Sequence, residues 1–124
     1  MKILLDEKSF QCKRLINDLK LCIEYEDYSF GNKETGINSS QLYDADVLIV
    51  DAHEEKNDQA GKILEIKKIK PDIKTVMLTS EINRKYRGFF LSRGVDFFVF
   101  KESEIMLFKN IINQIYLRKT KVSY

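Results

Sequence analysis

The chain has 124 residues, of which 44% are hydrophobic and 32% charged, and its formal net charge is +2. This length fits one domain with a core of its own, and the small net charge argues against nucleic acid or a membrane surface as a general partner. No apolar run reaches the roughly 18 residues that a bilayer-spanning helix needs. The early acids Asp6 and Glu7 interrupt any secretory signal, so we expect a cytoplasmic protein.

The N-terminal part of the chain predicts a strand, a helix and a second strand. Residues Lys2–Leu5 form a short apolar strand, and Ser9 can cap the helix that follows. The apolar positions of that helix recur at helical spacing and are Phe10, Leu15, Ile16 and Leu19. The segment Cys22–Glu26 alternates with period two, as a half-exposed edge strand does. Its cysteine and Cys12 lack metal-site spacing, and we expect both to be reduced.

The middle of the chain contains its most hydrophobic segment. Residues Lys33–Tyr43 should form a helix that is short or partly unwound, because glycine, asparagine and serine are frequent in it. The run Ala45–Val50 then contains four consecutive branched apolar residues, which predict a strand buried on both faces of a parallel sheet. Asp51 follows at the carboxyl end of this strand. Residues His53–Gln59 predict a polar loop.

The next two elements are a helix and a strand. The helix covers Ala60–Ile69 and ends before Pro71, the only proline of the chain. Its inward positions are expected to be Ile63, Leu64, Ile66 and Ile69. The strand covers Lys74–Thr79 and ends on two hydroxyl side chains, those of Thr79 and Ser80.

The C-terminal part predicts a helix, a strand and a last helix. The first of these helices covers Ile82–Arg93, and Gly94 is suited to end it. A strand at Asp96–Phe100 follows, and Ser103 can cap the last helix. The basic residues 119–124 should form a frayed tail.

The order of these elements predicts the fold. Five strands alternate with five helical segments, which requires right-handed crossovers and a parallel sheet covered on both faces. We therefore expect an α/β fold, a three-layer doubly wound five-stranded sheet with the flavodoxin-like order 2-1-3-4-5, over residues 1–118. This order places the first and third strands side by side. Asp6, Glu7 and Asp51 should then converge at the carboxyl edge of the sheet, where open α/β sheets bind ligands.

The side chains expected at this edge fit phosphoryl transfer. Three crowded carboxylates repel one another unless a cation joins them, and oxygen ligands at this density suit Mg²⁺. Asp51, the most central acid, can attack a phosphoryl donor and form an acyl phosphate. Lys101 and Thr79 can pair with phosphoryl oxygens through an ammonium and a hydroxyl group.

This set of residues resembles that of a known family, the receiver domains of two-component response regulators, and the resemblance covers nearly the whole chain. The positions that carry it are Asp6, Glu7, Asp51, Thr79 and Lys101. The resemblance implies a phospho-accepting signalling switch in a phosphorelay. It implies no enzymatic activity beyond Mg²⁺-dependent self-phosphorylation and dephosphorylation.

The resemblance also implies a role for each of these residues. Asp51 is expected to be the phospho-acceptor, and Thr79 and Lys101 the switch residues, with Phe98 at the aromatic switch position. The Mg²⁺ ligands are expected to be Asp6, Glu7, Asp51 and the backbone carbonyl of His53.

The chain departs from the family pattern around the acceptor. The loop after Asp51 lacks the usual proline and glycine, and Glu102 stands where proline usually follows Lys101. Glu54 and Glu55 add negative charge near a site that must receive an anion. An alternative is therefore a degenerate receiver that acts as a protein-interaction module without phosphorylation.

The resemblance implies partners as well. These are a sensor histidine kinase or a phosphotransfer protein, and a second copy bound through the last two helices and the fifth strand. The segment Gly94–Lys101 looks most like the subfamily that usually carries a C-terminal helix-turn-helix and regulates transcription, although this chain contains no such effector and should not contact DNA directly. Two other functions fit less well. Flavin or nucleotide binding lacks a Gly-rich phosphate loop after the first strand, and direct DNA binding lacks a recognition helix and sufficient positive charge.

Overall fold

The computed structural model describes residues 1–18, 24–29, 40–52 and 56–121. The strands of this part are β1 (Ile3–Asp6), β2 (Tyr25–Tyr28), β3 (Val47–Val50), β4 (Lys74–Thr79) and β5 (Phe97–Phe100). Its α-helices are α1 (Phe10–Asp18), α2 (Lys56–Ile69), α3 (Arg87–Leu91) and α4 (Ile105–Lys121), and a 3-10 helix, η1 (Glu81–Tyr86), precedes α3.

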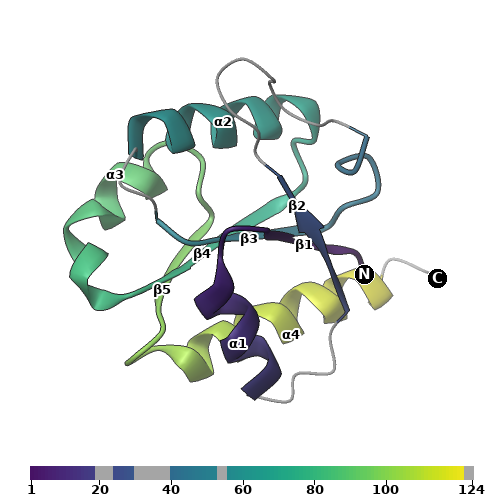
Figure 1. The fold of residues 1–124 in the computed structure, drawn as a ribbon. Coiled ribbons are helices and arrows are strands. Elements are labelled where there is room, and N and C mark those ends of the chain that lie inside the picture. Colours follow the sequence, from purple (N-terminus) through teal and green to yellow (C-terminus); the bar gives the residue numbers. More distant parts are fainter. Residues whose placement is uncertain (19–23, 30–39, 53–55, 122–124) are drawn as a thin grey trace.

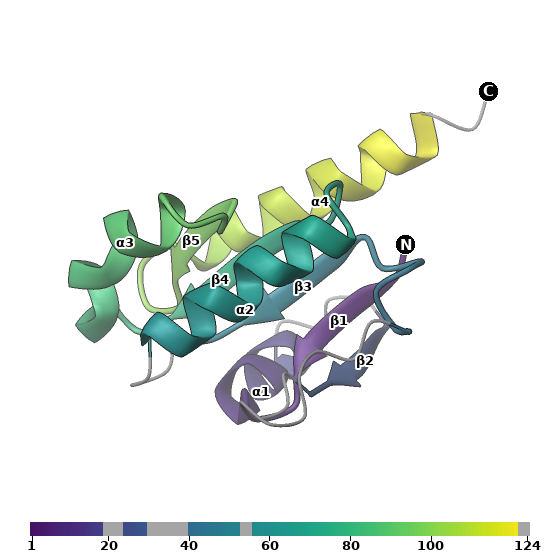
Figure 2. The same cartoon turned by 90° about the horizontal axis from the view of Figure 1, so that it is seen from above.

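The strands form a single parallel sheet in the order β2-β1-β3-β4-β5. Figure 1 shows α1 and α4 on one face of this sheet and α2 on the other, with α3 near the β5 edge. In the view from above, α2 lies along the sheet and the C-terminal end of α4 projects beyond it (Figure 2). The predicted doubly wound fold with strand order 2-1-3-4-5 is confirmed.

The core consists of two apolar layers, one on each face of the sheet. Every residue of β1 and β3 is buried, so the apolar run that ends at Val50 is covered on both faces, as predicted. On the side of α2 and α3, the buried side chains include Leu4, Leu48, Met77, Phe90 and Phe98. On the side of α1 and α4, they include Leu5, Ile16, Ile49, Val76 and Phe108. Successive strand residues alternate between the layers because their side chains point to opposite faces.

The second strand begins later than the sequence predicts. The expected strand Cys22–Glu26 is replaced by β2 at Tyr25–Tyr28, and residues 22 and 23 lie outside the described part. Tyr28 explains this shift, because its side chain is buried in the core whereas the two acids before it are exposed. The alternation of the earlier segment therefore did not identify the residue that anchors this edge strand.

The helices around β3 also differ from the prediction. Most of the predicted helix Lys33–Tyr43 lies outside the described part, and residues 40–43 form a turn. Helix α2 begins at Lys56, so the second half of the predicted loop His53–Gln59 is helical. Asp58 favours this start, because an acid in the first turn interacts well with the helix dipole and pairs with a lysine one turn later.

Three apolar helix residues that were expected in the core are exposed. They are Phe10 in α1 and Leu64 and Ile69 in α2. The predicted inward residues Ile16, Ile63 and Ile66 are buried, as expected, and Cys12 and Ala60 complete the inner faces of the two helices. The buried face of each helix is narrower than the spacing of its apolar residues indicated. This is ordinary for helices that cover only one face of a sheet.

Neither serine that was expected to cap a helix does so through its hydroxyl group. The buried Ser9 hydroxyl has no hydrogen-bond partner among the described residues, although the Ser9 carbonyl accepts from the Lys13 N–H at 3.1 Å. The Ser103 hydroxyl donates to the Glu81 carboxylate, because the loop after β5 lies against the loop after β4.

The connection from β4 to β5 ends in a tight turn at Gly94. The single helix predicted over Ile82–Arg93 is divided into η1 and α3, and η1 has no buried residue to hold it in the α form. Gly94 has a φ of 104°, and the Val95 N–H donates to the Phe90 carbonyl at 3.2 Å across it. Gly94 thus ends the helical segment, as predicted.

The last helix is longer than the sequence predicts. Helix α4 continues to Lys121, into the segment 119–124 that was expected to fray, and residues 122–124 lie outside the described part. Its inward residues, which pack on the sheet, are Phe108, Ile111, Ile112 and Ile115. In the described ranges, no helix is both long and apolar enough to cross a membrane.

Gly94→Ala should destabilise the protein. A side chain at a φ of 104° is strained, and we expect the free energy of unfolding to fall by about 1–2 kcal/mol in urea titrations. Gly61→Ala is the matched control, because Gly61 lies inside α2 with nothing near the added Cβ atom, and alanine there should stabilise by up to about 1 kcal/mol. Equal effects of the two substitutions would contradict the assigned turn.

Candidate functional site

The carboxyl edge of the sheet gathers polar side chains from four strands. Asp6 ends β1, Asp51 follows β3, Thr79 ends β4 and Lys101 follows β5. In the order β1-β3-β4-β5, the strand that carries Thr79 lies between those that lead to Asp51 and Lys101. Asp51 and Lys101 are therefore separated by two strand spacings, roughly 10 Å, which the long lysine side chain can bridge.

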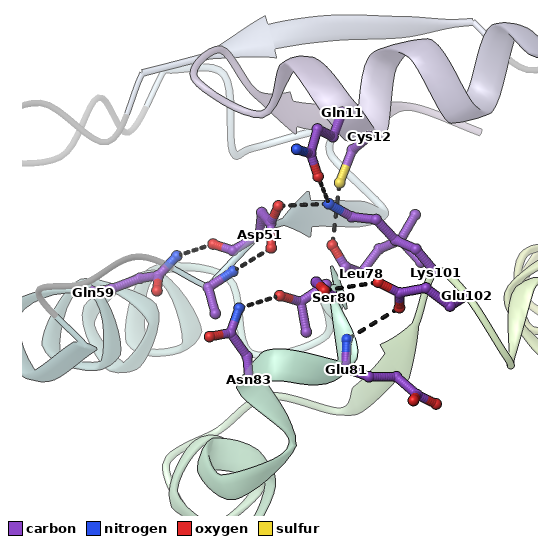
Figure 3. Close-up of polar contacts among 12 residues, drawn as sticks. Gln11, Cys12, Asp51, Gln59, Leu78, Ser80, Glu81, Asn83, Lys101 and Glu102 are labelled. Carbon is purple, nitrogen blue, oxygen red and sulfur yellow. Dashed lines mark hydrogen bonds and ion pairs between the residues drawn. The ribbon is translucent and has the colours of Figure 1, made fainter.

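Asp51 and Lys101 form an ion pair across the end of β4 (Figure 3). The Lys101 Nζ lies 2.8 Å from the Asp51 Oδ2, and the two side chains are only 11% and 21% exposed, respectively. The other carboxylate oxygen, Oδ1, accepts from the Ala52 N–H at 2.8 Å. On the opposite side, the Gln59 amide of α2 donates to the Asp51 carbonyl at 2.6 Å. Asp51 is thus fixed through both its side chain and its backbone.

Thr79 and Phe98, the other two expected switch residues, are both buried. The Thr79 hydroxyl accepts a hydrogen bond from the Asn83 side chain at 2.8 Å, and its carbonyl accepts from the Lys101 N–H at 2.9 Å. The Phe98 ring stacks on Phe90, with 6.2 Å between ring centroids. The backbone contact joins the two expected switch positions, whereas Phe98 is a core residue in this arrangement.

The expected cluster of three carboxylates is not formed. Asp6 is buried and its Oδ1 accepts from the Lys8 N–H at 3.2 Å, whereas Glu7 is exposed. Over residues 1–18, 24–29, 40–52 and 56–121, no three acidic, cysteine or histidine side chains lie close enough together to hold a metal ion. Asp51 is turned towards Lys101, and His53 lies outside the described residues.

Cys12 is buried near this edge of the sheet, although the sequence indicated no role for it. Its buried thiol donates to the Leu78 carbonyl at 3.2 Å. Burial raises the pKa of the Cys12 thiol to about 11, and the nearby charges of Asp51, Lys101 and Asp6 also influence it.

Glu102 connects the loops that follow β4 and β5. Its carboxylate accepts from the Ser80 hydroxyl at 2.7 Å and from the Glu81 N–H at 3.0 Å (Figure 3). The hydrogen bond from Ser80 is the main cause of the lowered pKa of Glu102. Glu102 thus ties the segment after Thr79 to the segment after Lys101.

Glu102→Gln should reduce stability at neutral pH but not in acid. Because the folded state lowers the pKa of Glu102, its contribution is present above the unfolded value of about 4.3 and is lost as the pH falls through the folded value. The carboxylate is exposed, so we expect a difference below about 1 kcal/mol at pH 7 in urea titrations. Glu65→Gln is the control, because Glu65 is an exposed acid of α2 without a hydrogen bond or ion pair to the described residues. A difference that is independent of pH would contradict this role.

Cys12 should resist thiol reagents in the folded protein. In a Cys22→Ser variant, so that one thiol remains, we expect no labelling by Ellman's reagent at pH 8, because the thiol is buried and its pKa is about 11. Labelling should appear together with unfolding when urea is added. Complete labelling without denaturant would show that the Cys12 thiol is not buried between α1 and the sheet.

No protein-family model and no curated protein matches the sequence. Several solved structures nevertheless match the chain in three dimensions. A response regulator receiver domain protein from Clostridium thermocellum has a TM-score of 0.63 at 20% identity, over 98% of this chain and 97% of that one. A protein described as an adenylate cyclase from Rhodopirellula baltica has a TM-score of 0.60 at 19% identity, over 97% and 92%.

A response regulator from Burkholderia pseudomallei, with a phosphorylated aspartic acid and a calcium ion, has a TM-score of 0.54 at 13% identity, over 98% of this chain and 72% of that one. Identities of 20% or less establish the fold alone, because one fold hosts many functions. The chain therefore has the fold of response-regulator receiver domains.

Proposed function

We propose that this chain is a response-regulator receiver domain that accepts a phosphoryl group on Asp51 from a sensor histidine kinase or a phosphotransfer protein. The observation that carries the proposal is the 2.8 Å ion pair between Asp51 and Lys101 at the carboxyl edge of a receiver fold. An acid and an ammonium group, each mostly shielded from solvent and brought together from distant loops, fit the needs of phosphoryl transfer.

In the proposed reaction, a carboxylate oxygen of Asp51 attacks the phosphorus of the donor. A bond forms between that oxygen and phosphorus, and the bond between phosphorus and the donor atom breaks. As this bond forms, the Lys101 ammonium moves from the Asp51 carboxylate to a phosphoryl oxygen, over a short path because it already lies 2.8 Å from the Oδ2. The Thr79 hydroxyl already accepts from Asn83 and can donate its own proton to a second phosphoryl oxygen.

We propose that Mg²⁺ binds at this edge when a phosphoryl donor arrives, although the acidic side chains described there do not form a metal-binding cluster in this structure. Asp6 and Asp51 follow adjacent strands and supply carboxylate oxygens, the ligand type that Mg²⁺ prefers. Glu7 and the backbone carbonyl of His53 are the other proposed ligands. When bound, the ion would neutralise part of the negative charge that a phosphoryl donor brings to Asp51.

The proposed output is a change in the surface built by the last helices and β5. Movement of Thr79 towards a phosphoryl group would pull on the segment that Glu102 holds, and Phe98 could then repack. Large apolar side chains are already exposed on η1, α3 and α4, namely Ile82, Leu91, Met106 and Leu107. This surface could bind a partner protein or a second copy of the chain, and a DNA-binding effector could act downstream of it.

A degenerate receiver is the second candidate, and a specific observation favours it. Both carboxylate oxygens of Asp51 are already engaged, Oδ1 by the Ala52 N–H and Oδ2 by Lys101. In this alternative, the Asp51–Lys101 pair is a permanent structural contact, and the chain binds its partner without phosphorylation.

Incubation with acetyl phosphate and Mg²⁺ distinguishes the two candidates. We expect the intact mass to rise by one phosphoryl group, and no such rise in Asp51→Asn. Asp72→Asn is the matched control and should be phosphorylated normally, because Asp72 lies in the turn before β4, at the other end of the strands. Circular dichroism should confirm that each variant is folded. An unmodified wild-type protein, or a phosphoryl group that persists in Asp51→Asn, would contradict the proposed acceptor.

A further inference from the structure

The Lys101 ammonium has a second acceptor besides Asp51. Its Nζ donates to the Gln11 Oε1 at 2.8 Å, the same distance as to the Asp51 Oδ2 (Figure 3). Gln11 lies in the first turn of α1, 90 residues before Lys101 in the sequence. Neither the strand-end pattern nor the receiver resemblance indicated a role for this glutamine.

The position of Gln11 is fixed by its neighbour in the helix. Cys12 is buried, and its thiol donates to the Leu78 carbonyl of β4 at 3.2 Å. The first turn of α1 is therefore anchored next to the strand that lies between Asp51 and Lys101. The backbone that carries the amide is therefore already held, and only the Gln11 side chain has to be ordered when it meets the ammonium.

We propose that Gln11 is a positioning residue that keeps the Lys101 ammonium at the site when Asp51 reacts; this inference rests on the proposed phosphoryl transfer to Asp51. For the Oδ2 of Asp51 to attack phosphorus, the ammonium must leave that oxygen. Lysine has a long flexible stem and a strongly hydrated head group, so without a second acceptor the ammonium would turn towards water. The hydrogen bond to Gln11 keeps it within reach of the incoming phosphoryl oxygens.

The neutral charge of Gln11 matters for this role. An amide oxygen accepts a hydrogen bond from the ammonium and does not repel a negatively charged phosphoryl donor. A carboxylate would also accept from the ammonium, but it would repel the donor. A glutamate at position 11 would also compete with the phosphoryl group for Lys101. The residue type that the chain carries here is thus one that positions the lysine without adding negative charge.

The test compares Gln11→Met, which keeps the side-chain length but removes the acceptor, with Gln11→Glu. The matched control is Asn17→Met, which removes an exposed amide from the same helix. We expect the maximal rate of phosphorylation by acetyl phosphate to fall about fivefold in Gln11→Met, as the loss of one hydrogen bond predicts, with little change in the half-saturating concentration. The rate should fall further in Gln11→Glu and remain unchanged in Asn17→Met.

Two readouts separate positioning from a general structural effect. In a Lys101→Met background, Gln11→Met should cause no further loss of rate, because both changes act through the same ammonium. In nuclear magnetic resonance spectra of lysine ammonium groups, the protons of Lys101 should exchange with water faster in Gln11→Met than in the wild type.

These outcomes also separate the positioning role from the proposed function. An equal loss of rate with and without Lys101, or unchanged ammonium exchange in Gln11→Met, would overturn the role of Gln11 even if Asp51 is phosphorylated. If the wild-type protein accepts no phosphoryl group, the proposed function and the role of Gln11 in it fail together. The exchange rates would then still report whether the contact itself holds Lys101.

Discussion

The candidate site depends on one ion pair, between Asp51 and Lys101. The two residues are 50 positions apart in the chain and follow strands that are not neighbours, so only the parallel arrangement of β3, β4 and β5 brings them together. Both side chains are largely shielded from water. An ionised group that is shielded in this way is costly to leave without a partner. The sheet therefore sets the distance, and the length of the lysine side chain allows the contact.

Other contacts at this edge connect the pair to the rest of the molecule. Gln11 and Gln59 reach it from α1 and α2, which lie on opposite faces of the sheet, so both helical layers contribute to the position of the two charges. Glu102 ties the loop after β5 to the loop after β4, next to Thr79. A change in charge at Asp51 would thus act on the loops after β4 and β5 together. A switch requires such a coupled response.

The sequence predicts the architecture well because the apolar patterns of the strands report burial directly. The run Ala45–Val50 is an example, and its burial is confirmed. The turn at Gly94 is a second local signal, of a different kind, and it is also confirmed. The sequence also predicts which residues follow the strands, and therefore that Asp51 and Lys101 lie at the same edge, but it predicts Lys101 as a partner of phosphoryl oxygens and not of Asp51 itself. It does not predict the helix side chains that complete the site, such as Gln11, because a polar residue on a helix has no pattern that identifies its distant partner. The expected cluster of three acids is wrong for the described residues because Lys101, rather than a second carboxylate, lies against Asp51.

A double-mutant cycle between Asp51 and Lys101 tests the central claim most directly. The free energies of unfolding of Asp51→Asn, Lys101→Met and the double variant should be compared with that of the wild type in urea. If the pair organises this edge of the sheet, the two changes should be coupled by about 1–3 kcal/mol, because removal of the second charge costs little once the first is gone. Additive effects would show that the two charges do not interact in solution, and the account of the site given above would be wrong.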